Sequence, residues 1–340
     1  MASPYHYSQT IGMFVEFGRG MSNPYDVAPA GDGRLFVLSR SNIFDAPNGG
    51  LRIGLMTLDE EYLAEWGRYG TGPGQLVWPN AMVVDPQGRL CISDEWRHDV
   101  QVFAQDGTLL ACWGGPGTQA GCFKRAAGLA FDATGHLLAV DAGNHRIQKF
   151  DPAGRYMTQW GTFGSAAGQL NMPWGIAVDA ADNVYVADWR NDRLQVFDAQ
   201  GHSLALIGST GTDDGQFRRP TGLCIDQAGH IIVADWGNER VQILQPDGRH
   251  LATLYGDATL SKWAAEFLEA SPDIVTKRHS AANLEQEKRF WGAVSVRVDH
   301  AGRLYVAEHS RHRVQIYQLQ DASPAGRGEV QRGTQKGEQQ

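Results

Sequence analysis

The chain has 340 residues, a formal net charge of −8 at pH 7, 42% hydrophobic residues and 41 glycines. This negative charge argues against a nucleic-acid partner, because phosphate binding is driven by clustered Lys and Arg. No stretch reaches the about 18 apolar residues of a membrane helix, and residues 1–13 lack an export signal, so we expect a cytoplasmic protein with no membrane association.

The first predicted element is a strand over residues 10–17. It ends in Glu16-Phe17-Gly18, like the Gln159-Trp160-Gly161 that closes one of the repeats further along the chain. The strand stands before the first repeat and has no repeat of its own. We therefore expect it to pair with an incomplete repeat elsewhere in the fold.

A repeat with a period of 47 residues follows, marked by the equally spaced Asp85, Asp132, Asp179 and Asp226. Each of these is followed nine residues later by a second acid: Asp94, Asp141, Asp188 and Asp235. Ala30 and Ser39 keep the nine-residue step in an earlier copy, and Asp299 and Glu308 keep it in a later one. The two outer copies lie 55 and 73 residues from their neighbours, which is the same period plus insertions of 8 and 26 residues. Six copies in this arrangement indicate a repeated structural unit.

Each copy is predicted to form four short strands joined by tight turns. In the copy that begins at Pro173, Val184 and Val186 alternate with Tyr185 and Ala187, a period of two that is typical of strands. The last copy stops after its third strand, residues 314–319, so the amino-terminal strand is predicted to complete it. The expected fold is all-β: one closed domain over residues 1–320, with six blades and no exposed end strands.

Residues 256–291 interrupt the repeat between the fifth and sixth copies. Trp263, Ala264 and Phe267 recur at helical spacing until Pro272, and residues 283–288 form a second helical stretch. The insertion either packs on an apolar edge or forms a lid over the channel mouth. Residues 321–340 are almost free of apolar side chains and are predicted to be a disordered tail.

The motifs of the copies resemble the NHL repeat. The fullest matches are Gly168-Gln169-Leu170 with Pro173, and the run from Val233 to Gln242, which contains Ala-Asp-x-x-Asn-x-Arg. The resemblance covers nearly the whole chain and implies a six-bladed β-propeller of NHL repeats. It leaves activity open, because NHL propellers include lyases, RNA-binding modules and protein-interaction scaffolds.

The row of second acids looks like a series of catalytic carboxylates, but its regularity favours a structural role. Four of its members have an arginine five residues later: Arg146, Arg193, Arg240 and Arg313. An acid and an arginine repeated in blade after blade are typical of an ion-pair network. Trp66, Trp113 and Trp160 recur in the same way and are assigned to packing.

Positions that break the repeat are better candidates for function. The resemblance implies that two sets of positions face one mouth of the channel: the residue after the proline of the Gln-(Leu/Phe)-x-x-Pro motif that leads into each copy, and the residue after each second acid. These sets supply the predicted ligand-binding residues Tyr25, Asn80, Trp174, Thr221, Trp189 and Trp236 and the catalytic candidates Arg40, Glu95 and His309. Concave aromatic surface with a few polar groups suits a small molecule, although any one Trp could simply plug the channel.

Arg297 stands in the innermost strand of the sixth copy, where the other copies have small or apolar residues. A buried guanidinium needs acceptors. It is therefore predicted either to bind an anionic ligand or to pair with Asp26.

The family's peptidyl-hydroxyglycine lyase holds zinc with three histidines, and this chain has Asn80, Trp174 and Val294 at the corresponding positions. We therefore predict no metal and no cofactor. Arg40 lies at a place similar to that of the lyase's arginine. The favoured hypothesis is a metal-independent, lyase-like or hydrolase-like site for a small anionic or aromatic molecule, with Arg40 and Arg297 holding the anion and His309 and Glu95 moving protons. The alternative is a non-catalytic protein-interaction scaffold.

Overall fold

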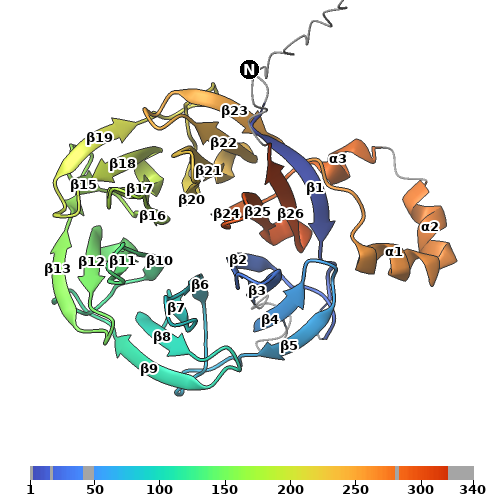
Figure 1. The fold of residues 1–340 in the computed structure, drawn as a ribbon, viewed down its shortest axis with the longest axis horizontal. Coiled ribbons are helices and arrows are strands. Elements are labelled where there is room, and N and C mark those ends of the chain that lie inside the picture. Colours follow the sequence, from blue (N-terminus) through green and yellow to red (C-terminus); the bar gives the residue numbers. More distant parts are fainter. Residues whose placement is uncertain (1–2, 16–17, 41–49, 280–282, 321–340) are drawn as a thin grey trace, which may run out of the picture.

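The computed structural model describes residues 3–15, 18–40, 50–279 and 283–320. Within these ranges the chain forms six four-stranded antiparallel sheets arranged as blades around a central axis (Figure 1). The predicted six-bladed propeller is therefore confirmed. Residues 16–17 and the predicted disordered tail, residues 321–340, lie outside the described residues.

The strands of each blade run in order from the axis to the rim. Blade 1 consists of β2 (Pro24–Pro29), β3 (Arg34–Ser39), β4 (Arg52–Thr57) and β5 (Tyr62–Trp66). Blade 2 consists of β6 (Pro79–Val84), β7 (Leu90–Asp94), β8 (Asp99–Phe103) and β9 (Leu109–Gly114). Blade 3 consists of β10 (Ala126–Phe131), β11 (Leu137–Asp141), β12 (Arg146–Phe150) and β13 (Tyr156–Trp160). Blade 4 consists of β16 (Ile176–Val178), β17 (Val184–Asp188), β18 (Arg193–Phe197) and β19 (Ser203–Ile207). Blade 5 consists of β20 (Pro220–Ile225), β21 (Ile231–Asp235), β22 (Arg240–Leu244) and β23 (His250–Leu254). Blade 6 consists of β24 (Ala293–Val298), β25 (Arg303–Glu308), β26 (Arg313–Leu319) and β1 (Tyr5–Ile11). A short parallel pair, β14 (Thr162–Phe163) and β15 (Gln169–Leu170), joins blades 3 and 4.

Closure of the ring depends on β1, which pairs antiparallel with β26 from Tyr5 opposite Leu319 to Ile11 opposite Val314. The predicted closure is confirmed, but the predicted bounds of the strand, residues 10–17, were too late. Polar side chains at His6, Ser8 and Gln9 hide the strand from a search for apolar alternation. The strand is instead specified by its partner β26, which lies more than 300 residues away.

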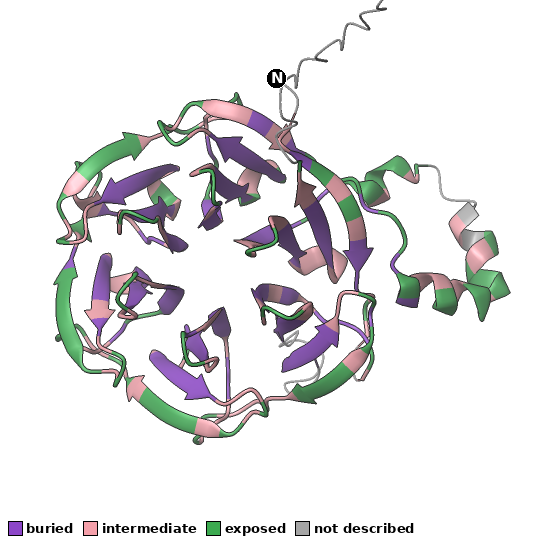
Figure 2. Ribbon diagram, viewed as in Figure 1, coloured by how far each residue is buried: buried purple, intermediate pink, exposed green. Residues whose placement is uncertain are grey.

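The core lies between the blades, because both faces of each sheet are apolar and each packs on a neighbouring blade. Figure 2 shows the three inner strands of the blades mostly buried and the outermost strands of blades 1 to 4 largely exposed, whereas the outermost strands β23 and β1 of blades 5 and 6 are partly buried. Trp66 packs on Phe103 with ring centroids 4.9 Å apart, which agrees with its predicted packing role. Gly107 has φ +87°, and a Cβ there would lie 2.6 Å from Trp66 Cγ, so this turn requires glycine.

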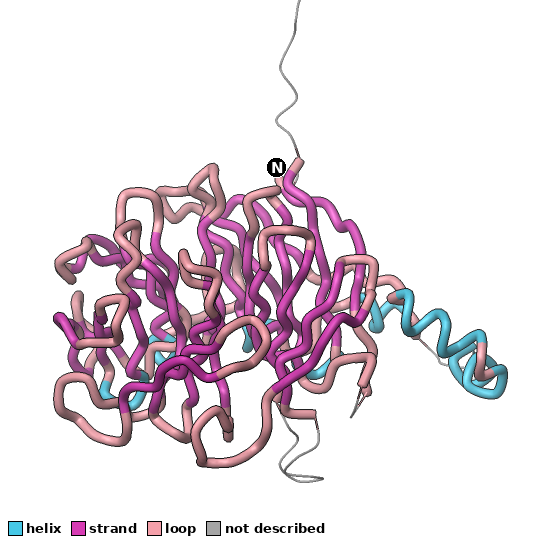
Figure 3. The backbone as a smooth tube through the Cα atoms, turned by 60° about the horizontal axis from the view of Figure 1, so that its bottom comes forward, coloured by secondary structure: helices cyan, strands magenta, loops and turns pink. Residues whose placement is uncertain are grey.

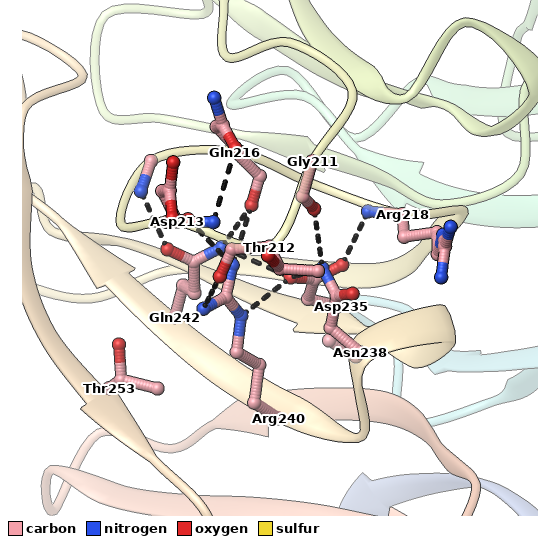
Figure 4. A network of polar contacts seen from close by, with 12 residues as sticks. Gly211, Thr212, Asp213, Gln216, Arg218, Asp235, Asn238, Arg240, Gln242 and Thr253 are labelled. Carbon is pink, nitrogen blue, oxygen red and sulfur yellow. Dashed lines mark hydrogen bonds and ion pairs between the residues drawn. The ribbon is translucent and has the colours of Figure 1, made fainter.

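The acidic row forms the predicted structural network, drawn for blade 5 in Figure 4. Asp235 is fully buried. Its carboxylate accepts hydrogen bonds from the Arg218 backbone N–H (2.7 Å), Asn238 Nδ2 (2.8 Å), Arg240 Nε (2.8 Å) and Gln242 Nε2 (3.1 Å). Arg240 in turn donates to three carbonyls of the preceding loop. The network thus fixes the loop between blades to the strands of the next blade.

The helical insertion contains α1 (Lys262–Glu269), α2 (Pro272–His279) and α3 (Glu285–Lys288). Figures 1 and 3 show α1 and α2 projecting sideways from the outer edge of the ring, beside β1. Trp263, 2% exposed, packs against Tyr62 of the outermost strand of blade 1 and donates from Nε1 to the Glu60 carbonyl (2.7 Å). The insertion therefore packs on the rim, and the lid alternative is wrong. The first helix, α1, ends before Pro272 as predicted. Pro272 itself begins a second helix, α2, that was not predicted, because proline is tolerated in a first turn.

Glu60 joins the insertion to the seam of the ring. Its carboxylate is 2% exposed and accepts hydrogen bonds from the Gly12 backbone N–H (2.6 Å), just after β1, and from the Trp263 backbone N–H (3.0 Å), in the first turn of α1. One side chain thus connects the closing strand, blade 1 and the insertion.

Replacing Glu60 by alanine is expected to lower the free energy of unfolding by about 2 kcal/mol, because two buried N–H groups lose a charged acceptor. Urea denaturation measures the change. Glu61→Ala removes an exposed carboxylate next to it and is expected to stay within about 0.5 kcal/mol of the wild type. Equal effects of the two changes would show that the seam does not depend on the Glu60 carboxylate.

Within the described residues, the structure contains no helix with the length and apolar character needed to span a membrane.

Candidate functional site

One mouth of the channel is formed by the loops that follow the second strand of each blade. In blades 3 to 6 these loops contain 3₁₀ turns, η1 (Ala142–Asn144), η2 (Trp189–Asn191), η3 (Trp236–Asn238) and η4 (His309–Arg311), which lie at one end of the strands in Figure 3. A cavity of about 290 Å³ opens at this mouth. Its size is at the lower end of the range for small-molecule sites.

The cavity brings together most of the residues that the sequence predicted. Seven of the ten line it: Tyr25, Arg40, Trp174, Trp189, Thr221, Trp236 and His309. The rings of Trp174 and Trp189 lie 6.1 Å apart at an interplanar angle of 36°. They give the wall of the cavity an extended aromatic surface, on which a flat molecule can pack.

Arg40 follows β3 and lies in the wall of the cavity with only 3% of the residue exposed. Its guanidinium carbon is 3.3 Å from the centre of the Tyr25 ring, and Nε donates to the Pro79 carbonyl (2.5 Å). Burial lowers the pKa of Arg40, an effect opposed by the nearby Tyr25 and Glu95. Nη2 is buried and finds no hydrogen-bond acceptor among the described residues. A ligand oxygen would supply the missing acceptor.

His309, the first residue of η4, faces Tyr25 edge-on with ring centroids 6.0 Å apart. The pKa of His309 is lowered to about 4. Burial is the main cause, and the positive charge of Arg40 and the nearby His312 lower it further. The imidazole is therefore neutral at pH 7. In this state it can accept a proton but is not a cationic acid.

The pKa of His309 predicts a pH dependence of stability. Unfolded His309 binds a proton near pH 6.5, whereas the folded protein resists protonation until about pH 4. The unfolded state therefore binds more protons between these values, and stability is lost as the pH falls through this window. The free energy of unfolding, measured with denaturant at pH 6.5 and at pH 4, should fall between these two pH values by about 2 kcal/mol less in His309→Asn than in the wild type. Parallel pH profiles would mean that His309 is not buried as described.

Three predicted site residues do not line this cavity. Glu95 is held by the guanidinium of Arg125 and lies 3.7 Å from Arg40 Nη2, so its carboxylate anchors two arginines. Asn80 is buried beside it, with Nδ2 3.5 Å from Glu95 Oε2, and borders a smaller cavity nearer the axis together with Tyr25 and Trp174. The roles of Glu95 in proton transfer and of Asn80 in ligand binding stay predictions.

Arg297 pairs with Asp26, the second of the two alternatives left open by the sequence. Arg297 Nε and Nη2 donate to the Asp26 carboxylate at 3.1 and 2.5 Å, and Ser295 Oγ also donates to it, at 2.5 Å. These side chains border a smaller cavity of about 30 Å³ near the axis, which shares Tyr25, Trp174, Thr221 and Val294 with the cavity at the mouth. Because its charge is already neutralised by a buried carboxylate, Arg297 does not supply a free anion site.

Sequence reasoning missed several lining residues that stand next to the predicted ones. Trp78, Arg125 and Met172 each precede the first residue of the innermost-strand motif, and Arg190 follows Trp189. Arg125 and Met172 have φ values of 68° and 51°. This left-handed backbone just before the strand distinguishes Arg125 and Met172 but not Trp78. The signal available in the sequence was their adjacency to the two sets of mouth positions.

The charge around the cavity is positive. Arg40, Arg125 and Arg190 line it, and none of the described lining residues is an Asp or Glu. Arg190 and Arg219 lie over the Trp189 ring at 5.7 and 5.2 Å. Aromatic walls beside arginines suit an anion with a flat apolar body.

The family profile described as NHL repeat matches residues 123–150, 170–197 and 217–244. These segments span strands in blades 3, 4 and 5, and the remaining blades have the same four-stranded topology. The chain is an NHL-repeat β-propeller. No curated protein matches it in sequence.

Solved structures with the same fold include proteins of known and unknown function. A protein of unknown function from Bacteroides thetaiotaomicron has a TM-score of 0.62 at 16% identity, over 91% of this chain and 73% of that one. A catalytically inactive virginiamycin B lyase from Staphylococcus aureus, with quinupristin, has a TM-score of 0.54 at 10% identity, over 93% and 89%. A streptogramin B lyase has a TM-score of 0.57 at 10% identity, over 93% and 98%. At these identities the likeness is one of fold alone.

In the described part of this NHL propeller, no group of three or more His, Cys, Asp or Glu side chains is placed to hold a metal ion.

Proposed function

We propose that the mouth of this NHL propeller binds a small organic anion with a flat aromatic or apolar body. The observation that carries the proposal is the buried Arg40 guanidinium, whose Nη2 lacks an acceptor among the described residues while its residue lines the aromatic cavity. The Glu95 carboxylate, 3.7 Å away, is too far from Nη2 for a hydrogen bond. A buried donor without a hydrogen bond is unfavourable, so a carboxylate or other anionic oxygen placed there gains a charge-assisted hydrogen bond. The Trp174 and Trp189 rings would then pack on the body of the ligand.

A chemical step at this site would be metal-independent. Arg40 would stabilise negative charge that develops on a substrate oxygen, and the neutral imidazole of His309 would accept a proton. Elimination and hydrolysis both need these two functions, so the proposed reaction class is lyase-like or hydrolase-like. The Staphylococcus aureus lyase with quinupristin supports the idea that a propeller of this fold can bind a small organic molecule.

Calorimetric titration with naphthoate and with the neutral naphthamide tests the proposal. The two probes have the same aromatic body, so the carboxylate alone accounts for a difference. We expect naphthoate to bind at least about 10-fold more tightly, which corresponds to about 1.4 kcal/mol. Equal affinities, or no measurable heat with either probe, would contradict the proposal.

The protein-interaction scaffold is a second candidate, favoured by the exposed apolar side chains of the insertion. Leu260, Phe267 and Ile274 are 44%, 47% and 40% exposed on the segment that projects from the ring. Such side chains are common anchors of protein interfaces. If this is the main role, Phe267→Ser should abolish partner binding while Arg40→Gln leaves it unchanged.

A further inference from the structure

We infer that the ligand carries two separated anionic groups, one bound by Arg40 and the other by Arg190 and Arg219 on the opposite side of the mouth. This inference rests on the proposed function, because it concerns the same cavity. It specifies the chemical class of the ligand: a dianion, such as a dicarboxylate, with an aromatic or apolar body.

Arg40 and Arg190 lie on opposite sides of the ring. Arg40 follows β3 in blade 1, and Arg190 follows β17 in blade 4. Blades 1 and 4 face each other across the axis in Figure 1. Both residues line the same cavity of about 290 Å³, so a ligand that fills it can reach both.

The guanidinium groups of Arg190 and Arg219 have no ion pair among the described residues. Each lies over the Trp189 ring instead. The nearby Asp192 carboxylate accepts from the Arg219 backbone N–H (2.7 Å) and from Thr210 Oγ1 (2.9 Å), so it is used by other donors.

Arginines on the turns at the other end of the strands differ in this respect. Arg89, Arg155 and Arg249 each form an ion pair with an aspartate of their own turn, at 2.5, 2.6 and 2.7 Å. These turns neutralise their own charge. The arginines opposite Arg40 leave theirs available to a ligand, because a neutral aromatic ring holds a guanidinium in place without neutralising its net charge.

The space between the two cationic sides is lined by aromatic and uncharged residues. Trp174, Trp189 and Trp236 contribute aromatic surface there, and no Asp or Glu is among the described lining residues. A ligand with one charge would leave the second cationic side without a counter-charge. A flat dianion matches both sides and the apolar middle.

Paired dicarboxylate and monocarboxylate probes test the inference by calorimetric titration. The series consists of para-linked dicarboxylates of benzene, naphthalene and biphenyl, each compared with its monocarboxylate. Three lengths are used so that at least one spans the mouth. For the best-fitting member we expect the dicarboxylate to bind about 10- to 100-fold more tightly.

Variants assign the second anionic group to its arginines. The double variant Arg190→Gln, Arg219→Gln should reduce the advantage of the dicarboxylate to less than about 3-fold while the monocarboxylate keeps its affinity. Arg40→Gln should weaken both probes, and the control Arg155→Gln, whose arginine is exposed on the opposite turns, should change neither. Both mutated arginines of the double variant are exposed, so the melting temperature should be unchanged.

The possible failures are distinguishable. If each dicarboxylate binds only as well as its monocarboxylate, the dianion inference is overturned and the proposed anion site stands. If an advantage appears but survives in the double variant, the assignment to Arg190 and Arg219 is overturned. If neither kind of probe binds, both the inference and the proposed function fail.

Discussion

Replacing Asp235 by alanine is expected to lower the free energy of unfolding by about 3–5 kcal/mol. The carboxylate is fully buried and accepts from one backbone N–H and three side chains. Its removal leaves the guanidinium of Arg240 buried without its counter-charge. Three carbonyl contacts of Arg240 to the preceding loop then lose the anchor that orients them.

Denaturant unfolding of Asp235→Ala measures this loss, and Asp247→Ala is the matched control. Asp247 also pairs with an arginine, Arg249, but both side chains are more than half exposed, so its removal should change stability by less than about 0.5 kcal/mol. If Asp235→Ala were as mild as the control, the acidic row would not hold the blades together. A functional role for the row would then have to be reconsidered.

Replacing Arg40 by glutamine is expected to weaken naphthoate binding about 100-fold, because the variant loses the buried charge that meets the carboxylate. The variant loses the Arg40 Nε hydrogen bond to the Pro79 carbonyl and the 3.7 Å ion pair of Nη2 with Glu95. It also removes the unfavourable desolvation of a buried charge, and Glu95 keeps its ion pair with Arg125. Because these effects oppose each other, stability should change by less than about 1 kcal/mol.

Calorimetric titration and a melting curve on the same preparation separate the two roles of Arg40. Loss of binding with an unchanged melting temperature would assign Arg40 to the ligand. A fall in stability like that of Asp235→Ala would assign Arg40 to the fold, and the cavity would lose its main anchor.

The repeat could be predicted from sequence because its determinants are local. Aspartates at a fixed period, turn glycines and alternating apolar residues all act within one blade. The two sets of mouth positions follow from the same repeat, which is why seven of ten predicted residues line the cavity.

The sequence left alternatives open where the structure joins segments that the repeat does not relate. Arg297 and Asp26 are 271 residues apart and meet only because the ring closes, so the sequence could not choose between this ion pair and an anionic ligand. The rim position of the insertion depends on Glu60, 203 residues before Trp263, so the sequence could not choose between an edge and a lid. Glu95 was assigned a chemical role from its position, and its carboxylate also pairs with Arg125, a residue of the next blade that sequence spacing did not bring into view.

A crystal structure of the protein with naphthoate tests the central claim most directly, because it locates the ligand and its charged group at once. We expect the aromatic body of naphthoate between the tryptophans of the mouth and its carboxylate within hydrogen-bond distance of Arg40 Nη2. Naphthoate bound at the rim beside the insertion, or in the mouth with its carboxylate directed away from Arg40, would contradict it.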